Sequence, residues 1–166
     1  MVFKNKEIYV DFDNTLCLWK VPARRVYSEE VAYKATDKNG LEVWTRDFYN
    51  ETDCVLNTVL VDFLRECKNN GCTITLLTNE TWPFKVEAKK LWLSQKAPEL
   101  IDSAVRLSSS AVKSDYLKDA YTDLKDIVLI DDKYAEQIKP ALSLGICAYT
   151  VQYIYIYIYI YYDGVY

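Results

Sequence analysis

The chain has 166 residues, of which 51% are hydrophobic and 27% are charged, with 4 glycines, 4 prolines and a formal net charge of -4. This length and composition predict one compact domain with little linker material, and they exclude a largely disordered chain. The acidic balance excludes a broadly basic surface, so no stable nucleic-acid partner is indicated.

Short apolar runs and helical patterns alternate along the chain. The apolar runs are rich in β-forming residues and are typical of buried parallel strands. For the first helix, Thr52 or Asp53 is the expected cap and Gly71 the expected stop. The predicted strands cover residues 7–12, 72–78, 103–107, 126–130 and 146–151, and the predicted helices cover residues 55–67, 83–93, 114–121 and 133–144.

This alternation predicts an α/β fold, a doubly wound (Rossmann-like) three-layer sandwich with a mostly parallel central sheet. We expect residues 1–152 to form a single domain. Ligands of such sheets bind beyond the carboxyl ends of the strands.

One segment after the first predicted strand breaks the alternation. Residues 25–49 form two β-rich arms around Asn39-Gly40, and Asn-Gly is the strongest short signal for a hairpin. We therefore expect a β-hairpin flap inside an insertion of residues 19–54. Its aromatic and arginine side chains could pack on the domain or contact a substrate.

A Tyr/Ile-rich tail covers residues 153–166, and Tyr153–Tyr162 alternates strictly. A period of two predicts a strand that could be an edge strand, a dimer contact or a membrane-associated segment. Tyrosines belong at bilayer interfaces rather than in the hydrocarbon core, so we expect no membrane association. Because long unprotected edges invite pairing, a homodimer through this C-terminal strand is predicted.

The chain has 5 cysteines and no histidine. No CxxC pair is present, so the cysteines are interpreted as reduced, mostly buried thiols rather than zinc ligands. Without histidine, Ser-His-Asp and Cys-His catalysis are excluded, and acid-base chemistry falls to carboxylates, lysines or a metal. The segment Met1–Tyr9 has no apolar signal core, so a cytoplasmic location is expected.

Polar residues follow three of the predicted strands: Asp11–Asp13, Thr78–Asn79 and Asp131–Asp132. The carboxyl ends of parallel strands meet at one edge of a sheet, so these residues should converge. Asp11 could attack phosphorus to form an acyl phosphate. Asp13 could protonate the leaving oxygen and later deprotonate water. The simpler alternative for both is a capped turn.

Hard oxygen ligands favour magnesium over zinc or copper, and a metal would let a carboxylate approach a phosphate dianion. Lys113 is the best candidate for a cation on the phosphoryl oxygens, with Lys85 as the alternative. Asp132 could instead cap the following helix or act behind the metal ligands. The candidate metal ligands are Asp11, Asp13, Asp131 and Asp132, and the candidate substrate-binding residues are Thr15, Thr78, Asn79 and Lys113.

Four motifs stand in one order: DFDNTL at Asp11–Leu16, LLTN at Leu76–Asn79, Lys113, and LIDD at Leu129–Asp132. This order resembles the haloacid dehalogenase-like (HAD) hydrolase superfamily, and the short insertion resembles its small-cap or capless members. The resemblance implies magnesium and a phospho-aspartate formed on Asp11. It also implies Asp13 as acid/base with its carbonyl on the metal, Thr78 and Lys113 as phosphate ligands, and Asp131 as a metal ligand. Aspartate at position 13 favours phosphatases over dehalogenases.

Two rival functions use similar residues. A signalling receiver domain also combines acids, Thr and Lys around magnesium, but its acceptor Asp follows the third strand, whereas Asp11 follows the first. A non-catalytic module on the same fold is expected to have lost one of the acids. The expected partner is therefore a phosphorylated substrate: a nucleotide, a polynucleotide end or a phosphoprotein.

Overall fold

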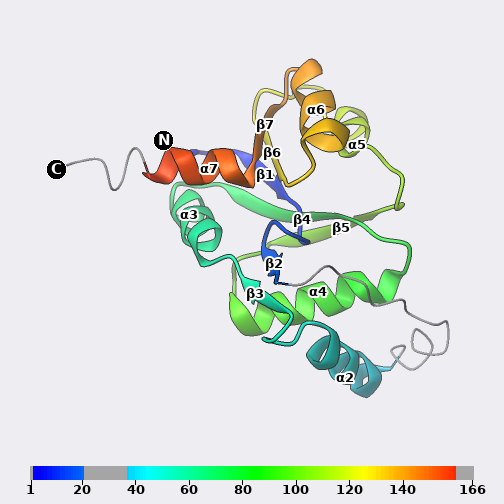
Figure 1. Ribbon diagram of the computed structural model, residues 1–166. Coiled ribbons are helices and arrows are strands. Elements are labelled where there is room, and N and C mark those ends of the chain that lie inside the picture. The colour runs from blue at the N-terminus through cyan, green and yellow to red at the C-terminus, as the bar shows by residue number, and fades with distance from the viewer. Residues whose placement is uncertain (1, 21–36, 160–166) are drawn as a thin grey trace.

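The computed structural model describes residues 2–20 and 37–159 and shows an α/β fold around a five-stranded parallel sheet (Figure 1). The strand order is β5-β4-β1-β6-β7, so the first strand lies at the centre. This arrangement confirms the predicted fold class. The strands are β1 Glu7–Val10, β4 Thr73–Asn79, β5 Ser103–Leu107, β6 Ile127–Asp131 and β7 Cys147–Thr150.

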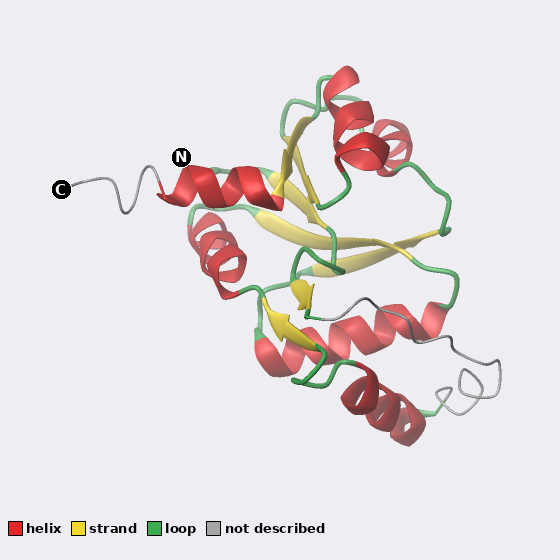
Figure 2. Ribbon diagram, viewed as in Figure 1, coloured by secondary structure: helices red, strands yellow, loops and turns green. Residues whose placement is uncertain are grey.

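Helices cover both faces of the sheet, which gives three layers (Figure 2). Along β1, Ile8 and Val10 face the larger core, whereas Tyr9 faces the smaller one, because successive side chains of a strand point to opposite faces. Helices α3 (Thr58–Asn69), α4 (Pro83–Lys96) and α7 (Val151–Ile158) pack on the larger core. Helices α5 (Lys113–Ala120) and α6 (Lys139–Ser143), with the π-helix η1 (Tyr134–Ile138), pack on the smaller core.

Helix α3 begins later than predicted. Residues 54–56 form strand β3 (Cys54–Leu56), and the cap is Asn57 rather than Thr52 or Asp53. The Asn57 Oδ1 accepts a hydrogen bond from the Leu60 amide at 3.2 Å, as an N-cap should. The buried Asn57 side chain also donates to the Thr15 carbonyl at 2.7 Å. The cap therefore ties α3 to the loop that follows β1.

The insertion after β1 contains an antiparallel β-hairpin, as predicted, but the turn does not lie where it was predicted. Strand β2 (Cys17–Trp19) pairs antiparallel with β3, so a small two-stranded unit is present, but it does not turn at Asn39-Gly40. Those two residues lie in the first turn of α2 (Lys38–Phe48), and the predicted hairpin is wrong there. Residues 25–36 of that prediction lie outside the described residues.

Two interactions explain why Asn-Gly is helical here. The Asp37 carboxylate accepts from the Gly40 amide at 2.6 Å and caps α2. Further along, the buried Trp44 stacks on Phe48 and meets Phe84 of α4 edge to face. Burial of this aromatic face outweighs the local turn preference.

The Tyr/Ile run is also not a strand where it is described. Residues Val151–Ile158 form α7, capped by Thr150, and Val151 and Ile154 are buried in the larger core. The basis for pairing through a C-terminal strand is absent from these residues, and residues 160–166 lie outside the description. The homodimer stays a prediction. Among the described residues, no helix has the length and apolar character needed to cross a membrane.

The remaining helices differ from the prediction mainly at their ends. The helix predicted over residues 133–144 is divided into η1 and α6, and Pro140 lies in the first turn of α6.

The 5 cysteines are all free, and only Cys147 is exposed, which agrees with the interpretation as thiols.

Candidate active site

The carboxyl ends of β4, β1 and β6 lie side by side and bring the predicted polar residues to one cavity of about 170 Å³. Among the predicted residues, Thr15 does not line it: this residue is fully buried, and its carbonyl accepts the bond from Asn57. The lining residues are Asp11, Asp13, Asn14, Thr78, Asn79, Lys113, Asp131, Asp132, Lys133 and Gln137.

A tight loop after β1 places Asp11 and Asp13. The Asp11 amide donates to the Ile130 carbonyl at 2.9 Å, which continues the pairing of β1 with β6. The Phe12 carbonyl then accepts from the amides of Leu16 and Cys17 at 3.0 and 2.9 Å. Asn14 has a positive φ of 54°, a conformation that Asn tolerates better than most residues. The chain thus turns at once and presents both acids at the end of the sheet.

Lys113 joins two of the strand ends. Its Nζ donates to Asp11 Oδ1 at 2.5 Å and to Asp131 Oδ2 at 2.6 Å, and its side chain is almost fully buried. Burial raises the pKa of Asp11 to about 6, even though the Lys113 ammonium acts in the opposite direction. By contrast, Lys85 Nζ lies 3.5 Å from Glu80 Oε2, and Lys85 does not line the cavity. Of the two lysines considered, only Lys113 contacts the Asp11 carboxylate.

Three carboxylates form a group that could hold a metal ion. Oxygen atoms of Asp11, Asp131 and Asp132 lie within 4.8 Å of one another. The Asp132 Oδ1 is buried without a hydrogen-bond partner, and burial raises the pKa of this carboxyl. A buried, unsatisfied carboxylate oxygen beside two further acids fits a hard divalent cation. The Asp13 carboxylate is not part of this group.

Asp13 is held by two residues that sequence reasoning did not assign to the site. Its Oδ2 accepts from Lys89 Nζ at 2.8 Å, and its Oδ1 accepts from Trp19 Nε1 at 2.9 Å. Burial raises the pKa of the Asp13 carboxyl, but the Lys89 ammonium outweighs burial and keeps that pKa below its usual range. The Lys89 ammonium therefore favours the ionised form of Asp13.

A sequence signal for Lys89 existed. The buried face of α4 includes Val86, Lys89 and Trp92 at intervals of three residues, so the lysine falls within an apolar stripe. A lysine at such a position must find a buried partner.

Asn79 and Gln137 fix the segment that precedes Lys113. The Asn79 Nδ2 donates to the carbonyls of Ser108 and Ala111, both at 2.8 Å. The Gln137 Oε1 accepts from the Lys113 amide at 2.8 Å, and its Nε2 donates to the same Ala111 carbonyl at 3.3 Å. Gln137 was not predicted. Its amide has both functions here because it can donate and accept at once.

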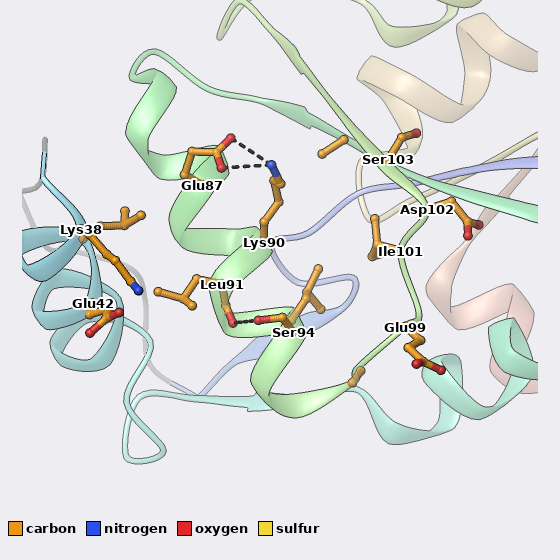
Figure 3. Close-up of a pocket in the computed structure, with 14 residues that line it drawn as sticks. Lys38, Glu42, Glu87, Lys90, Leu91, Ser94, Glu99, Ile101, Asp102 and Ser103 are labelled. Carbon is orange, nitrogen blue, oxygen red and sulfur yellow. Dashed lines mark hydrogen bonds and ion pairs between the residues drawn. The ribbon is translucent and has the colours of Figure 1, made fainter.

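A larger cavity of about 470 Å³ lies elsewhere, between α2, α4 and the start of β5 (Figure 3). Leu41, Leu91 and Ile101 contribute apolar surface, and the Lys90 ammonium at its rim pairs with Glu87 at 3.0 Å. None of the carboxylates at the strand ends line this cavity. The carboxylates at the ends of β1 and β6 therefore line the smaller cavity and not this one.

Comparison with known proteins identifies the fold. No protein-family model matches the sequence, and no curated protein matches it. Solved structures do match. The HAD domain of the effector protein Lem4 from Legionella pneumophila, as an inactive mutant, has a TM-score of 0.54 at 11% identity, covering 89% of this chain and 84% of that chain. The same domain in a second structure has a TM-score of 0.53 at 12% identity, with 89% and 85% covered.

A provisionally assigned phosphoglycolate phosphatase from Lactobacillus delbrueckii subsp. bulgaricus is also similar, with a TM-score of 0.53 at 12% identity and coverage of 89% of this chain and 86% of that chain. Identity this low shows the fold and nothing finer. The chain has a HAD-like fold, which confirms the resemblance seen in its motifs. The carboxyl ends of its central strands carry a three-aspartate group that could bind a metal.

Proposed function

We propose that this chain is a magnesium-dependent phosphatase that hydrolyses a phosphate monoester through a phospho-aspartate on Asp11. The observation that carries the proposal is the contact of Lys113 with both Asp11 and Asp131 at the end of the sheet, beside the unsatisfied Asp132 oxygen. A nucleophile, a cation for phosphoryl oxygens and an acidic metal group then share one small cavity.

In the first step, a carboxylate oxygen of Asp11 attacks phosphorus, and the bond from phosphorus to the leaving oxygen breaks. In this proposal Lys113 and the Thr78 hydroxyl donate to phosphoryl oxygens, a role supported by their position in the lining of the same cavity as Asp11. Magnesium, held by Asp11, Asp131 and Asp132, would neutralise charge on the phosphoryl group. Asp11 must be ionised to attack, and the pKa of about 6 leaves it so at neutral pH.

Asp13 is the candidate for proton transfer in both steps. It borders the cavity and reaches the same space as Asp11. The ionised form, which the Lys89 ammonium favours, is the one that takes a proton from water when the acyl phosphate is hydrolysed. The first step needs a proton on Asp13, and an arriving phosphate dianion favours this because a nearby negative charge raises a carboxyl pKa.

The chemistry is tested with p-nitrophenyl phosphate, which demands little of a substrate pocket. We expect hydrolysis that requires Mg²⁺, that beryllium fluoride inhibits as a mimic of the aspartyl phosphate, and that falls at least about 1,000-fold in Asp11→Asn. Asp62→Asn is the matched control, because Asp62 is an exposed acid on α3. Full activity in Asp11→Asn would refute the mechanism.

The substrate is a separate question. A cavity of about 170 Å³ suits a phosphoryl group better than a whole metabolite, which supports an exposed phosphate on a nucleotide, a polynucleotide end or a protein. A panel of nucleoside monophosphates, sugar phosphates, phosphopeptides and 5′- and 3′-phosphorylated oligonucleotides separates these classes. Preference for sugar phosphates over all the others would contradict the expectation.

A further inference from the structure

Helix α4 buries a lysine ammonium directly behind the candidate active site. The Lys89 side chain is 0% exposed, and its Nζ contacts oxygen atoms from two chain segments. It lies 2.8 Å from Asp13 Oδ2 in the loop after β1, 2.8 Å from Thr78 Oγ1 at the end of β4, and 2.5 Å from Glu80 Oε1 just beyond. An ammonium group has three N–H donors, so these contacts use all of them.

The position of this charge is fixed by its surroundings. Burying an ammonium is costly unless it is paired and hydrogen-bonded. Glu80, whose side chain is 11% exposed, supplies a paired charge that belongs to no motif of the site. The centroid of the Phe12 ring lies 5.2 Å from Nζ, and the ring adds a favourable contact with the cation. Glu80 and Phe12 therefore hold Lys89 at one place between Asp13 and Thr78.

This contact sets the direction of the Thr78 hydroxyl. A lysine ammonium can only donate, so Thr78 Oγ1 must accept from it. The hydroxyl hydrogen of Thr78 is then free to point away from Lys89. Because Thr78 lines the cavity, that hydrogen is available to a phosphoryl oxygen. Lys89 likewise fixes one oxygen of Asp13, while Trp19 fixes the other.

We propose that Lys89, held by Glu80, is a positioning residue that orients the Thr78 hydroxyl as a donor to the phosphoryl group and fixes the Asp13 carboxylate. This inference rests on the proposed phosphatase function. Lys89 does not meet the substrate, because none of its side chain is exposed. Its effect on the reaction must therefore pass through Thr78 and Asp13. Combining substitutions of Lys89 and Thr78 can distinguish this indirect effect from a direct contact with the substrate.

The main test is a Lys89→Met/Glu80→Gln double variant, which removes the Lys89 and Glu80 charges together and leaves only Asp13, whose side chain is 40% exposed to water, without its ammonium partner. We expect kcat for p-nitrophenyl phosphate to fall about 100-fold, the size of effect that misplaced catalytic groups produce, with KM changed far less. Lys90→Met is the matched control: Lys90 is the next residue of α4, its side chain is 48% exposed, and it pairs with Glu87. It should keep wild-type kcat.

A second variant separates positioning from a merely structural role. Thr78→Val is introduced into the wild type and into the double variant. If Lys89 acts through Thr78, Thr78→Val should lower kcat by less than about threefold in the double variant, where the hydroxyl is no longer oriented. The same substitution should cause a larger loss of kcat in the wild type. An undiminished Thr78→Val effect in a folded double variant, or wild-type kcat in that variant, overturns the inference.

The outcomes also distinguish this inference from the proposed function. Thermal unfolding first establishes that each variant folds. If the double variant does not fold, the Glu80→Gln single variant replaces it, because it keeps Lys89 but removes the ion pair that fixes its position. An unchanged kcat in Glu80→Gln then overturns the inference. A wild-type protein that neither hydrolyses p-nitrophenyl phosphate nor binds orthophosphate with Mg²⁺ in calorimetry refutes the proposed function and this inference together. An active wild type with insensitive variants refutes the inference alone.

Discussion

Asp11 lies in a cluster whose charges do not balance. Its carboxylate group shares one buried ammonium with Asp131, and Asp132 is close by. Burial raises the pKa of Asp11 to about 6, well above the value of an unfolded Asp. The unfolded chain therefore gives up this proton at a lower pH than the folded chain does. As pH rises from about 4 to about 6, the ionised Asp11 progressively destabilises the metal-free fold.

Asp11→Asn should therefore stabilise the protein in EDTA at pH 8 by about 3 kcal/mol, because the two pKa values differ by about 2 units and each unit corresponds to about 1.4 kcal/mol. The gain should disappear toward pH 4, where the wild-type carboxyl is protonated in the folded state. Urea unfolding at pH 4, 6 and 8 measures the change, and Asp62→Asn on the surface of α3 is the control with no gain expected. An Asp11→Asn variant that is less stable than wild type at pH 8 contradicts this account.

The residues at the strand ends could be found from sequence because geometry brings them together. Acids and threonine at the ends of neighbouring parallel strands must converge, and Asp11, Thr78 and Asp131 line one cavity. Lys89 could not be assigned in this way. It comes from the middle of a helix, and its role depends on how α4 packs against Asp13 and Glu80. Only its place in an apolar stripe indicated a buried partner.

At the scale of elements, the predicted strands are confirmed where short apolar runs alternate with helical patterns along the chain. They are wrong where the prediction rested on a local sequence pattern alone. The apolar runs of β1, β4 and β6 are mostly buried, as is typical of parallel strands inside a sheet. Asn39-Gly40 favoured a turn, but a cap from Asp37 and the burial of Trp44 favour a helix. Such tertiary contacts cannot be read from a dipeptide.

The Tyr/Ile run shows the same limit and gives a direct test. In a strand, Ile154 and Ile156 would lie on one face and be equally buried. In α7 they lie about 200° apart around the axis. Accordingly, Ile154 is 2% exposed and packs in the larger core, whereas Ile156 is 59% exposed.

Ile154→Ala should destabilise the protein by about 3 kcal/mol, whereas Ile156→Ala should change its stability by less than about 0.5 kcal/mol. Both substitutions remove the same atoms, so the difference reports only on the position in the helix. Chemical unfolding of the two variants measures it. Equal losses in both variants would indicate a strand, and would restore the basis for pairing through this segment.

At the scale of the whole molecule, two cores share one sheet. Ile8 and Val10 of β1 belong to the core beneath α3, α4 and α7, and Tyr9 between them belongs to the core beneath α5 and α6. Neither layer can lose its packing without uncovering the same strands. The sequence indicated this arrangement through its alternation of strands and helices, because short parallel strands need helical crossovers on both faces.

This sharing predicts that the domain unfolds in one step, and tryptophan provides the probe. Trp44 and Trp92 are buried in the larger core, and no tryptophan lies in the smaller core of the described residues. Leu117 of α5 is fully buried in the smaller core, so Leu117→Ala should cost about 3 kcal/mol. For a chain of this size that lowers Tm by roughly 6 to 12 °C.

If the two cores unfold together, Leu117→Ala lowers the Tm seen by tryptophan fluorescence as much as the Tm seen by far-UV circular dichroism, although the mutated layer contains no tryptophan among the described residues. Leu142→Ala on α6 is the control, because its side chain is 48% exposed and its removal leaves no cavity. A fluorescence transition that stays at the wild-type temperature while circular dichroism shifts would show that the layers unfold separately. The shared packing of β1 would then not be enough to couple the two cores, and the layer of α5 and α6, which carries Lys113, would unfold on its own.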